Sequence, residues 1–194
     1  MSPLSSSVVM WVSLAVLVFW ALGAYNRLVR LRAELVRSLQ AVTAQWDSTA
    51  QTLRSTLQAY AAEPASESQW GSLGVYEENI PRRSLSLAAK QLQACLTGLI
   101  SKPHTQATVD DLASLGAARE VLNNAWERLQ DRHEDLAGAA VPQQLMVLWQ
   151  QHAMQSDEKL LAYNTQARAY NQAIAQFPAL LVAWIFGFNS TVSL

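Results

Sequence analysis

Residues 28–60 read LVRLRAELVRSLQAVTAQWDSTAQTLRSTLQAY, and their large apolar side chains recur every seven positions. One row consists of Leu28, Leu35 and Val42, and the other of Leu39, Trp46, Leu53 and Tyr60. Two rows offset by three and four positions form an apolar stripe along one side of an α-helix, which is the pattern of helical bundles and coiled coils. The spacing therefore predicts a helix that buries this stripe against other helices.

Three later segments carry the same repeat of seven. The rows are Leu85, Leu92 and Leu99 in residues 84–101; Leu115, Leu122, Leu129 and Leu136 in the segment that starts at Thr108; and Met146, Ala153, Leu160, Ala167 and Ile174 beside Trp149, Ser156, Tyr163, Tyr170 and Phe177 in residues 143–177. Pro64, Pro103 and Pro142 separate the segments, because proline disfavours helix at the residue before it. Residues 65–83, with two glycines and Pro81, are predicted to be a loop. The fold expected is all-α, an antiparallel up-down bundle of about four helices.

The start of the third helix has a specific signal. Thr108 is followed three positions later by Asp111, which resembles a capping box, and Asp110 adds a second acid in the first turn. Acidic side chains are favoured at the positive end of a helix. We therefore expect this helix to begin directly after Thr108.

Residues 4–24, LSSSVVMWVSLAVLVFWALGA, contain no charged side chain. About 20 apolar residues suffice for a helix to cross a bilayer, so the stretch predicts a transmembrane anchor. The alternative is a cleaved signal peptide, which the absence of a basic segment before it and the poor cleavage site at Leu22-Gly23-Ala24 disfavour. Four arginines follow the apolar stretch and no Lys or Arg precedes it, which predicts a cytoplasmic bundle and an N-terminus outside.

Composition limits the chemistry to be expected. The net charge is −1, which argues against a nucleic-acid partner bound through phosphate neutralisation. His104, His133 and His152 lie in separate segments without metal-ligand spacing, so neither a metal nor another cofactor is expected. Cys95 stands alone and is predicted to be a buried, inert thiol. We expect no enzyme, although a site hidden between helices is the alternative.

The dipeptide Tyr-Asn occurs three times, as Tyr25-Asn26, Tyr163-Asn164 and Tyr170-Asn171, and Phe177-Pro178 follows the last pair by one more heptad step. The spacing of Tyr163, Tyr170 and Phe177 predicts three steps of one buried seam. Asn164 and Asn171 are predicted to form interhelical hydrogen bonds that fix register. The alternative is that the three pairs form a membrane-proximal patch for a partner protein.

The C-terminal stretch ALLVAWIFGF, residues 179–188, is uncharged and too short to span a bilayer. Two placements are open. The stretch either lies in the membrane interface, with Trp184 and Phe188 among the headgroups, or folds back as an apolar cap on the bundle.

Both ends of the chain resemble the LemA family of bacterial membrane proteins. The resemblance rests on Tyr25-Asn26-Arg27-Leu28-Val29 directly after the apolar segment, and on the two later Tyr-Asn pairs followed by Ile174, Phe177-Pro178 and Phe186-Gly187-Phe188. Between these ends the family's proline-containing stretch is replaced by residues 49–54, TAQTLR, so the chain resembles a divergent member. The resemblance implies a bacterial single-pass membrane protein with a long helical bundle, and it implies no reaction.

The sequence thus predicts an N-terminal tail and anchor in residues 1–24, a helical bundle in residues 25–178 and an apolar tail in residues 179–194. The expected function is that of a non-catalytic scaffold, adaptor or sensor in the bacterial inner membrane. Its partners would be the lipid bilayer, through residues 4–24 and in one alternative residues 179–188, and a protein that the sequence does not name. A secreted or periplasmic helical domain is the alternative. Heptad rows can be satisfied within one chain or between chains, so an oligomer is also open.

Overall fold

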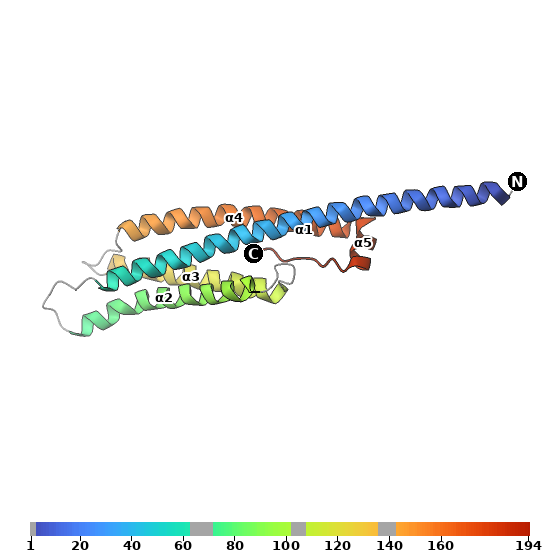
Figure 1. Ribbon diagram of the computed structural model, residues 1–194. Helices are drawn as coiled ribbons and strands as arrows, with labels where there is room; N and C mark the ends of the chain where they lie inside the picture. Colours follow the sequence, from blue (N-terminus) through green and yellow to red (C-terminus); the bar gives the residue numbers. More distant parts are fainter. Residues whose placement is uncertain (1–2, 63–71, 102–107, 136–142) are drawn as a thin grey trace. The chain divides into compact units, whose positions relative to one another are not determined.

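The computed structural model describes residues 3–62, 72–101, 108–135 and 143–194, and side chains for 8–59, 82–101, 108–131 and 143–194 of these. The described residues form five helices and no strand (Figure 1): α1 Pro3–Ala62, α2 Ser72–Ile100, α3 Val109–Asp135, α4 Gln143–Ala175 and α5 Ala179–Phe186. The all-α prediction is confirmed. The predicted apolar segment and the helix after it are one uninterrupted helix, α1, that ends directly before Glu63-Pro64 as expected.

One predicted element is wrong. The expected loop of residues 65–83 is helical from Ser72 onward, because α2 begins there and continues through Pro81. Proline has a backbone φ in the helical range, so a long helix can pass through it at the loss of one backbone hydrogen bond. The remainder of that expected loop lies outside the described residues.

The contacts divide the chain into two compact units. We call residues 1–39 with 162–193 the tail unit, and residues 40–161 with 194 the bundle unit. Helices α1 and α4 each contribute to both units, whereas α2 and α3 belong to the bundle unit and α5 to the tail unit. The boundaries predicted from sequence, after residues 24 and 178, stay a prediction.

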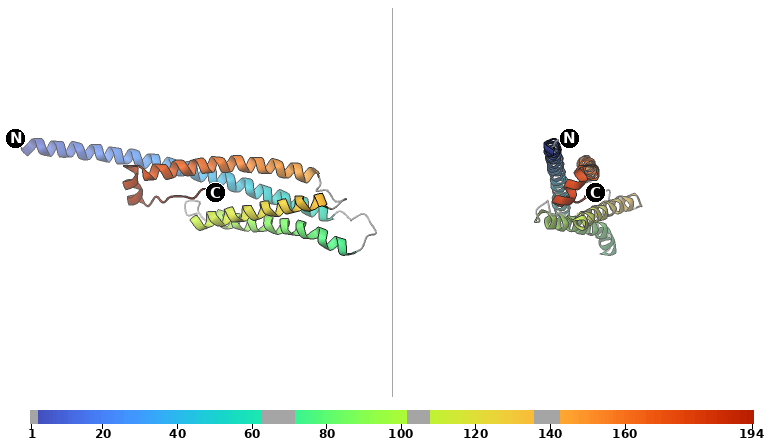
Figure 2. Two further views of the ribbon diagram at one scale, coloured as in Figure 1. Left: turned by 180° about the vertical axis from the view of Figure 1, so that it is seen from behind. Right: turned by 90° about the vertical axis from the view of Figure 1, so that its right-hand side faces the viewer.

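In the bundle unit the predicted rows form the core. Buried members of these rows are Val42, Trp46 and Leu53 of α1; Leu85, Leu92 and Leu99 of α2; Leu115, Leu122 and Leu129 of α3; and Ser156 of α4. The register predicted for the start of α4 is wrong, because the predicted Met146 is 43% exposed and the buried side chain is Leu145, one position earlier. The α2 and α3 helices pack against each other along their length, as the two views of Figure 2 show. The side chains of Tyr60 and Leu136 lie outside those described.

The predicted start of α3 is confirmed. Thr108 Oγ1 accepts a hydrogen bond from the Asp111 backbone N–H at 3.2 Å, and the Asp111 carboxylate accepts one from the Thr108 backbone N–H at 3.0 Å. The two residues thus satisfy each other's free N–H groups, as in a capping box.

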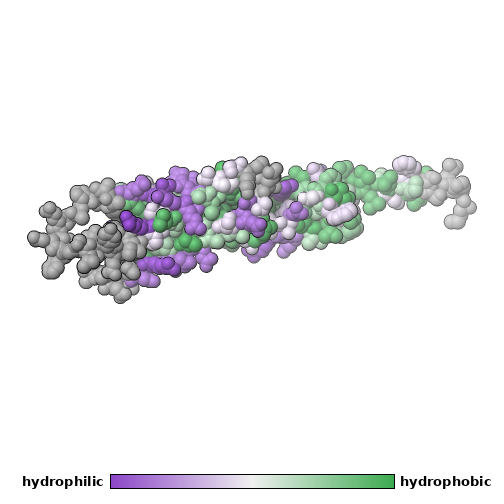
Figure 3. Space-filling model, turned by 90° about the horizontal axis from the view of Figure 1, so that it is seen from below, coloured by the Kyte–Doolittle hydropathy of each residue, from purple (hydrophilic) through white to green (hydrophobic). Residues whose placement is uncertain are grey.

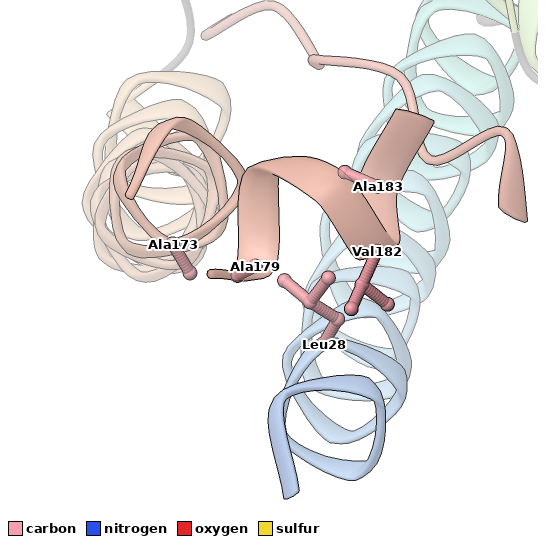
Figure 4. Close-up of a cluster of buried hydrophobic side chains, with 5 residues drawn as sticks. All are labelled: Leu28, Ala173, Ala179, Val182 and Ala183. Carbon is pink, nitrogen blue, oxygen red and sulfur yellow. The ribbon is translucent and has the colours of Figure 1, made fainter. Parts of the chain in front are cut away.

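The tail unit has a small core of its own. Leu28 of α1 lies against Val182, Ala179 and Ala183 of α5, with Ala173 of α4 at the edge (Figure 4). Small side chains on α4 and α5 let the short α5 approach closely, and Leu28 fills the space between them. α5 then ends at Gly187, whose φ of +68° is left-handed and favours glycine.

α1 also contains a long exposed apolar stretch. Every described residue from 8 to 23 is exposed, including Trp11, Phe19 and Leu22. In Figure 3 the described part of α1 towards the N-terminus is green, whereas the bundle unit shows many purple, hydrophilic side chains. By length and composition this one helix could cross a membrane, a test that an N-terminal signal sequence also passes.

Candidate functional site

All eight residues predicted as a site belong to the tail unit. The three Tyr-Asn pairs do not contact the same residues there. Tyr25 lies against the end of α5, whereas Tyr163 and Asn171 contact the chain that follows α5.

The segment after α5 is held by a group that we call the tail clasp: Tyr163, Asn171, Thr191 and Val192. The Asn171 amide donates to the Thr191 carbonyl at 2.7 Å and accepts from the Thr191 N–H at 3.0 Å. The Tyr163 hydroxyl donates to the Val192 carbonyl at 2.9 Å. The Tyr163 hydroxyl also forms a hydrogen bond with the Thr191 hydroxyl at 3.4 Å, so four hydrogen bonds fix two consecutive tail residues on α4.

The tail clasp corrects the role expected of Asn171. Its predicted hydrogen bond to a neighbouring helix is wrong, because the partner is the backbone of the tail. A primary amide has both the donor and the acceptor of a peptide group, so one asparagine can pair with both polar groups of an extended residue. These backbone groups would otherwise lack an intrachain partner, since the tail after residue 188 forms no helix or strand.

The path of the tail follows from its two attachment points. Asn171 binds Thr191. Tyr163, which lies nearer the start of α4, binds the next residue of the tail, Val192. The tail therefore runs antiparallel to α4. Gly187 starts this reversal: the Phe188 N–H donates to the Ala183 carbonyl at 2.9 Å, which closes α5. Figures 1 and 2 show the chain turning back after α5.

Burial keeps the phenol of the tail clasp neutral. Loss of solvent raises the pKa of Tyr163 above its usual 10.0, and the hydrogen bond with Thr191 opposes the rise. Burial likewise raises the pKa of Tyr170, against the opposing charge of Arg32. A phenol of ordinary pKa is already protonated at neutral pH, so the rise in pKa extends the pH range over which Tyr163 remains a donor to Val192.

An aromatic cluster joins α1 to the end of α5. The Tyr25 ring lies 4.9 Å from that of Phe186 and 6.1 Å from that of Phe188, between centroids. The Arg32 guanidinium lies 5.6 Å from the Phe188 centroid, within the range of a cation–π interaction. The cluster fixes α5 beside the part of α1 that directly follows the apolar segment.

The predicted seam is only partly confirmed. Tyr163 and Tyr170 are buried as expected, but Phe177 is 69% exposed. α4 ends at Ala175, so the heptad spacing no longer applies two residues later. Phe177 instead packs edge-on against Trp20, at 5.2 Å between centroids, and Pro178 after it precedes α5.

Two of the predicted asparagines have other surroundings. Asn26 is exposed on α1. Asn164 is half-buried, and its backbone carbonyl accepts from the Arg168 side chain at 3.2 Å. A partner patch that uses these residues stays a prediction.

Sequence reasoning missed the residues that the clasp and the cluster contact. Thr191 and Val192 carry no pattern, because the clasp uses the Val192 carbonyl and the backbone groups of Thr191 rather than a side-chain motif. Phe186 and Phe188 belong to the family resemblance, and Arg32 is one of the four arginines that follow the apolar segment. The one sequence signal for the tail clasp is Asn171, a polar residue on a helix that the heptad seam does not require.

The chain matches no protein-family model, no curated protein and no solved structure. Within the described ranges, no three His, Cys, Asp or Glu side chains gather in a way that could hold a metal ion. Cys95 is half-buried rather than fully buried as expected.

Proposed function

We propose that this protein is a single-pass, membrane-anchored helical-bundle protein that acts without catalysis, as a scaffold, adaptor or sensor. The observation that carries the proposal is the continuity of α1. One helix bears an exposed apolar stretch and then, without a break, the patterned stripe that enters a protein core.

The anchor proposal rests on length and on exposure. At 1.5 Å per residue, the predicted segment 4–24 is about 30 Å long, the thickness of a bilayer's hydrocarbon core. Leaving so many large apolar side chains in water is unfavourable by about 25 cal/mol per Å². A lipid environment removes that penalty.

α5 adds a second apolar surface to the same unit. One face of α5 buries Ala179, Val182 and Ala183 against protein. This face agrees with the placement of residues 179–188 as an apolar cap. Its other face exposes Leu180, Leu181, Trp184, Ile185 and Phe186, with Trp184 83% exposed. We propose that this second face lies in the membrane interface, where tryptophan is favoured.

The same proposal extends to location and family. Arg27, Arg30 and Arg37 follow the apolar segment, which supports a cytoplasmic bundle by the positive-inside rule. The residues that resemble the LemA family at both ends fall in the tail unit, and several of them pack on one another. Membership of that family would place the chain in a bacterial inner membrane.

Cysteine labelling in intact cells tests anchor and orientation together. Single cysteines would replace Ser2 and the exposed Ser101 in a Cys95→Ala background, followed by an impermeant maleimide. Labelling at position 2 alone is the expected result. Labelling at position 101 would contradict the orientation, and a mature chain that begins near Tyr25 would favour the secreted alternative instead.

A further inference from the structure

The bundle unit contains a cavity of about 240 Å³ among its four helices. Buried side chains form its floor, among them Trp46, Leu92 and Leu122. Charged side chains stand at its edge: Arg119, Glu127 and Asp157. All residues that line the cavity belong to the bundle unit, and none belongs to the proposed membrane anchor.

Three of the chain's seven tryptophans line this cavity, which concentrates aromatic surface at one place. Trp126 and Trp149 stack on each other at 4.6 Å between centroids and 13° between planes. The Arg119 guanidinium lies 5.2 Å from the centroid of Trp46. Arg119 thus occupies one face of Trp46, and the concentration of indole rings in the lining suits an aromatic ligand.

Trp46 differs from an ordinary packing residue. It is 2% exposed, and its indole N–H has no acceptor within the described part of the chain. A buried donor without a partner costs about 1–3 kcal/mol, which a leucine or phenylalanine would avoid. Packing alone therefore does not account for an indole at the cavity floor, but the N–H does not select the ligand class, because an ammonium group has no lone pair to accept from it.

The charges at the edge do not cancel. Arg119 forms an ion pair with Asp157 at 2.6 Å, which leaves Glu127 as the third charge. Glu127 is exposed and forms no ion pair with any other described residue. The edge of the cavity therefore has a net charge of −1, which attracts a cation and disfavours an anion.

We propose that this cavity binds a small aromatic ammonium compound. Its ring lies among the tryptophans and leucines, and its ammonium group pairs with Glu127 at the edge. A cavity of 150 Å³ holds benzene, so this larger one takes roughly ten non-hydrogen atoms.

Calorimetric titration of the full-length protein in detergent with phenethylammonium tests the proposal. We expect saturable one-to-one binding with a dissociation constant at or below about 1 mM, as for small ligands with few contacts. Glu127→Gln should weaken binding about two- to fivefold, because the lost charge pair is exposed to solvent. Glu120→Gln, an exposed acid on the same helix that does not line the cavity, should leave binding unchanged.

Two further measurements separate a specific site from general partition into micelles. 3-Phenylpropionate, which has a similar ring and the opposite charge, should bind at least about tenfold more weakly. Ala153→Leu should fill part of the cavity and abolish binding while the thermal midpoint stays the same or rises. Absence of saturation up to about 10 mM, equal binding of the anion, or binding unaffected by Glu127→Gln would each overturn the proposal.

Discussion

The two halves of α1 have the same secondary structure and opposite surroundings. From Val8 to Gly23 each residue is exposed, whereas from Leu28 to Leu53 buried residues recur at the heptad positions. The helix does not change geometry between them. What changes is the pattern: apolar all round in the first half, and apolar along one stripe in the second.

The comparison shows that the arrangement of apolar residues, more than their number, selects the environment. A stripe leaves the other faces polar, so only one side must be covered, and neighbouring helices can do this. A helix that is apolar all round needs a surrounding apolar medium. The described part of the chain leaves every residue from 8 to 23 exposed, which is why the lipid bilayer is the proposed apolar medium.

Substituting alanine for one leucine in each half of α1 tests this comparison, and the buried leucine should give the strongest of the predicted effects. Leu53 is fully buried, so Leu53→Ala should lower the free energy of unfolding by about 2–5 kcal/mol through lost burial and a cavity. Leu17 is 56% exposed, and Leu17→Ala should leave the unfolding of the bundle unit within about 0.5 kcal/mol of wild type. Chemical denaturation in detergent, followed by helical circular dichroism, measures both.

The opposite ranking would contradict the comparison. If Leu17→Ala destabilised the bundle as much as Leu53→Ala, residues 8–23 would have to pack on protein. An exposed position in the second half, Ala44→Ser, provides the control for substitution within α1 itself, since it should change little.

Much of the bundle unit was predictable because its signal is periodic. Rows of seven identified Leu92, Leu122 and Trp46 as core residues, and the capping pair at Thr108 located the start of α3. The error at residues 72–83 arose from local rules: proline and glycine weaken a helix, but the surrounding sequence decides whether it continues.

The contacts of the tail unit were less predictable for a physical reason. They join residues far apart in sequence, and the clasp uses backbone groups that every residue possesses. The Tyr-Asn repeat did identify Tyr163 and Asn171 as unusual. It could not identify the tail as their partner, because an amide pairs equally well with a helix side chain or an extended backbone.

The second prediction concerns Asn171, and its expected effect is intermediate. Asn171→Ala removes two hydrogen bonds and leaves both backbone groups of Thr191 without their partner, which should destabilise the clasped tail by about 1–3 kcal/mol. Amide hydrogen exchange of residues 188–193 should then accelerate, while exchange in α2 and α3 stays unchanged. Asn26→Ala, at an exposed position, is the matched control, and acceleration in that variant would contradict the assignment.

The smallest effect is expected from the Tyr163 hydroxyl, and pH isolates it. Because burial raises the pKa of Tyr163 in the folded protein above 10.0, folding favours the protonated phenol. Its contribution is therefore fully present below about pH 10 and is lost as the pH rises through the higher folded pKa. Tyr163→Phe should lower stability at pH 8 by about 0.5–1.5 kcal/mol through the lost bond to Val192, and its thermal midpoint should fall less than that of wild type between pH 9 and about pH 11. Tyr170→Phe is the control for the second buried phenol, whose pKa is also raised. If the thermal midpoint of Tyr163→Phe fell with pH in parallel to that of wild type, the Tyr163 phenol would not be buried in the folded state.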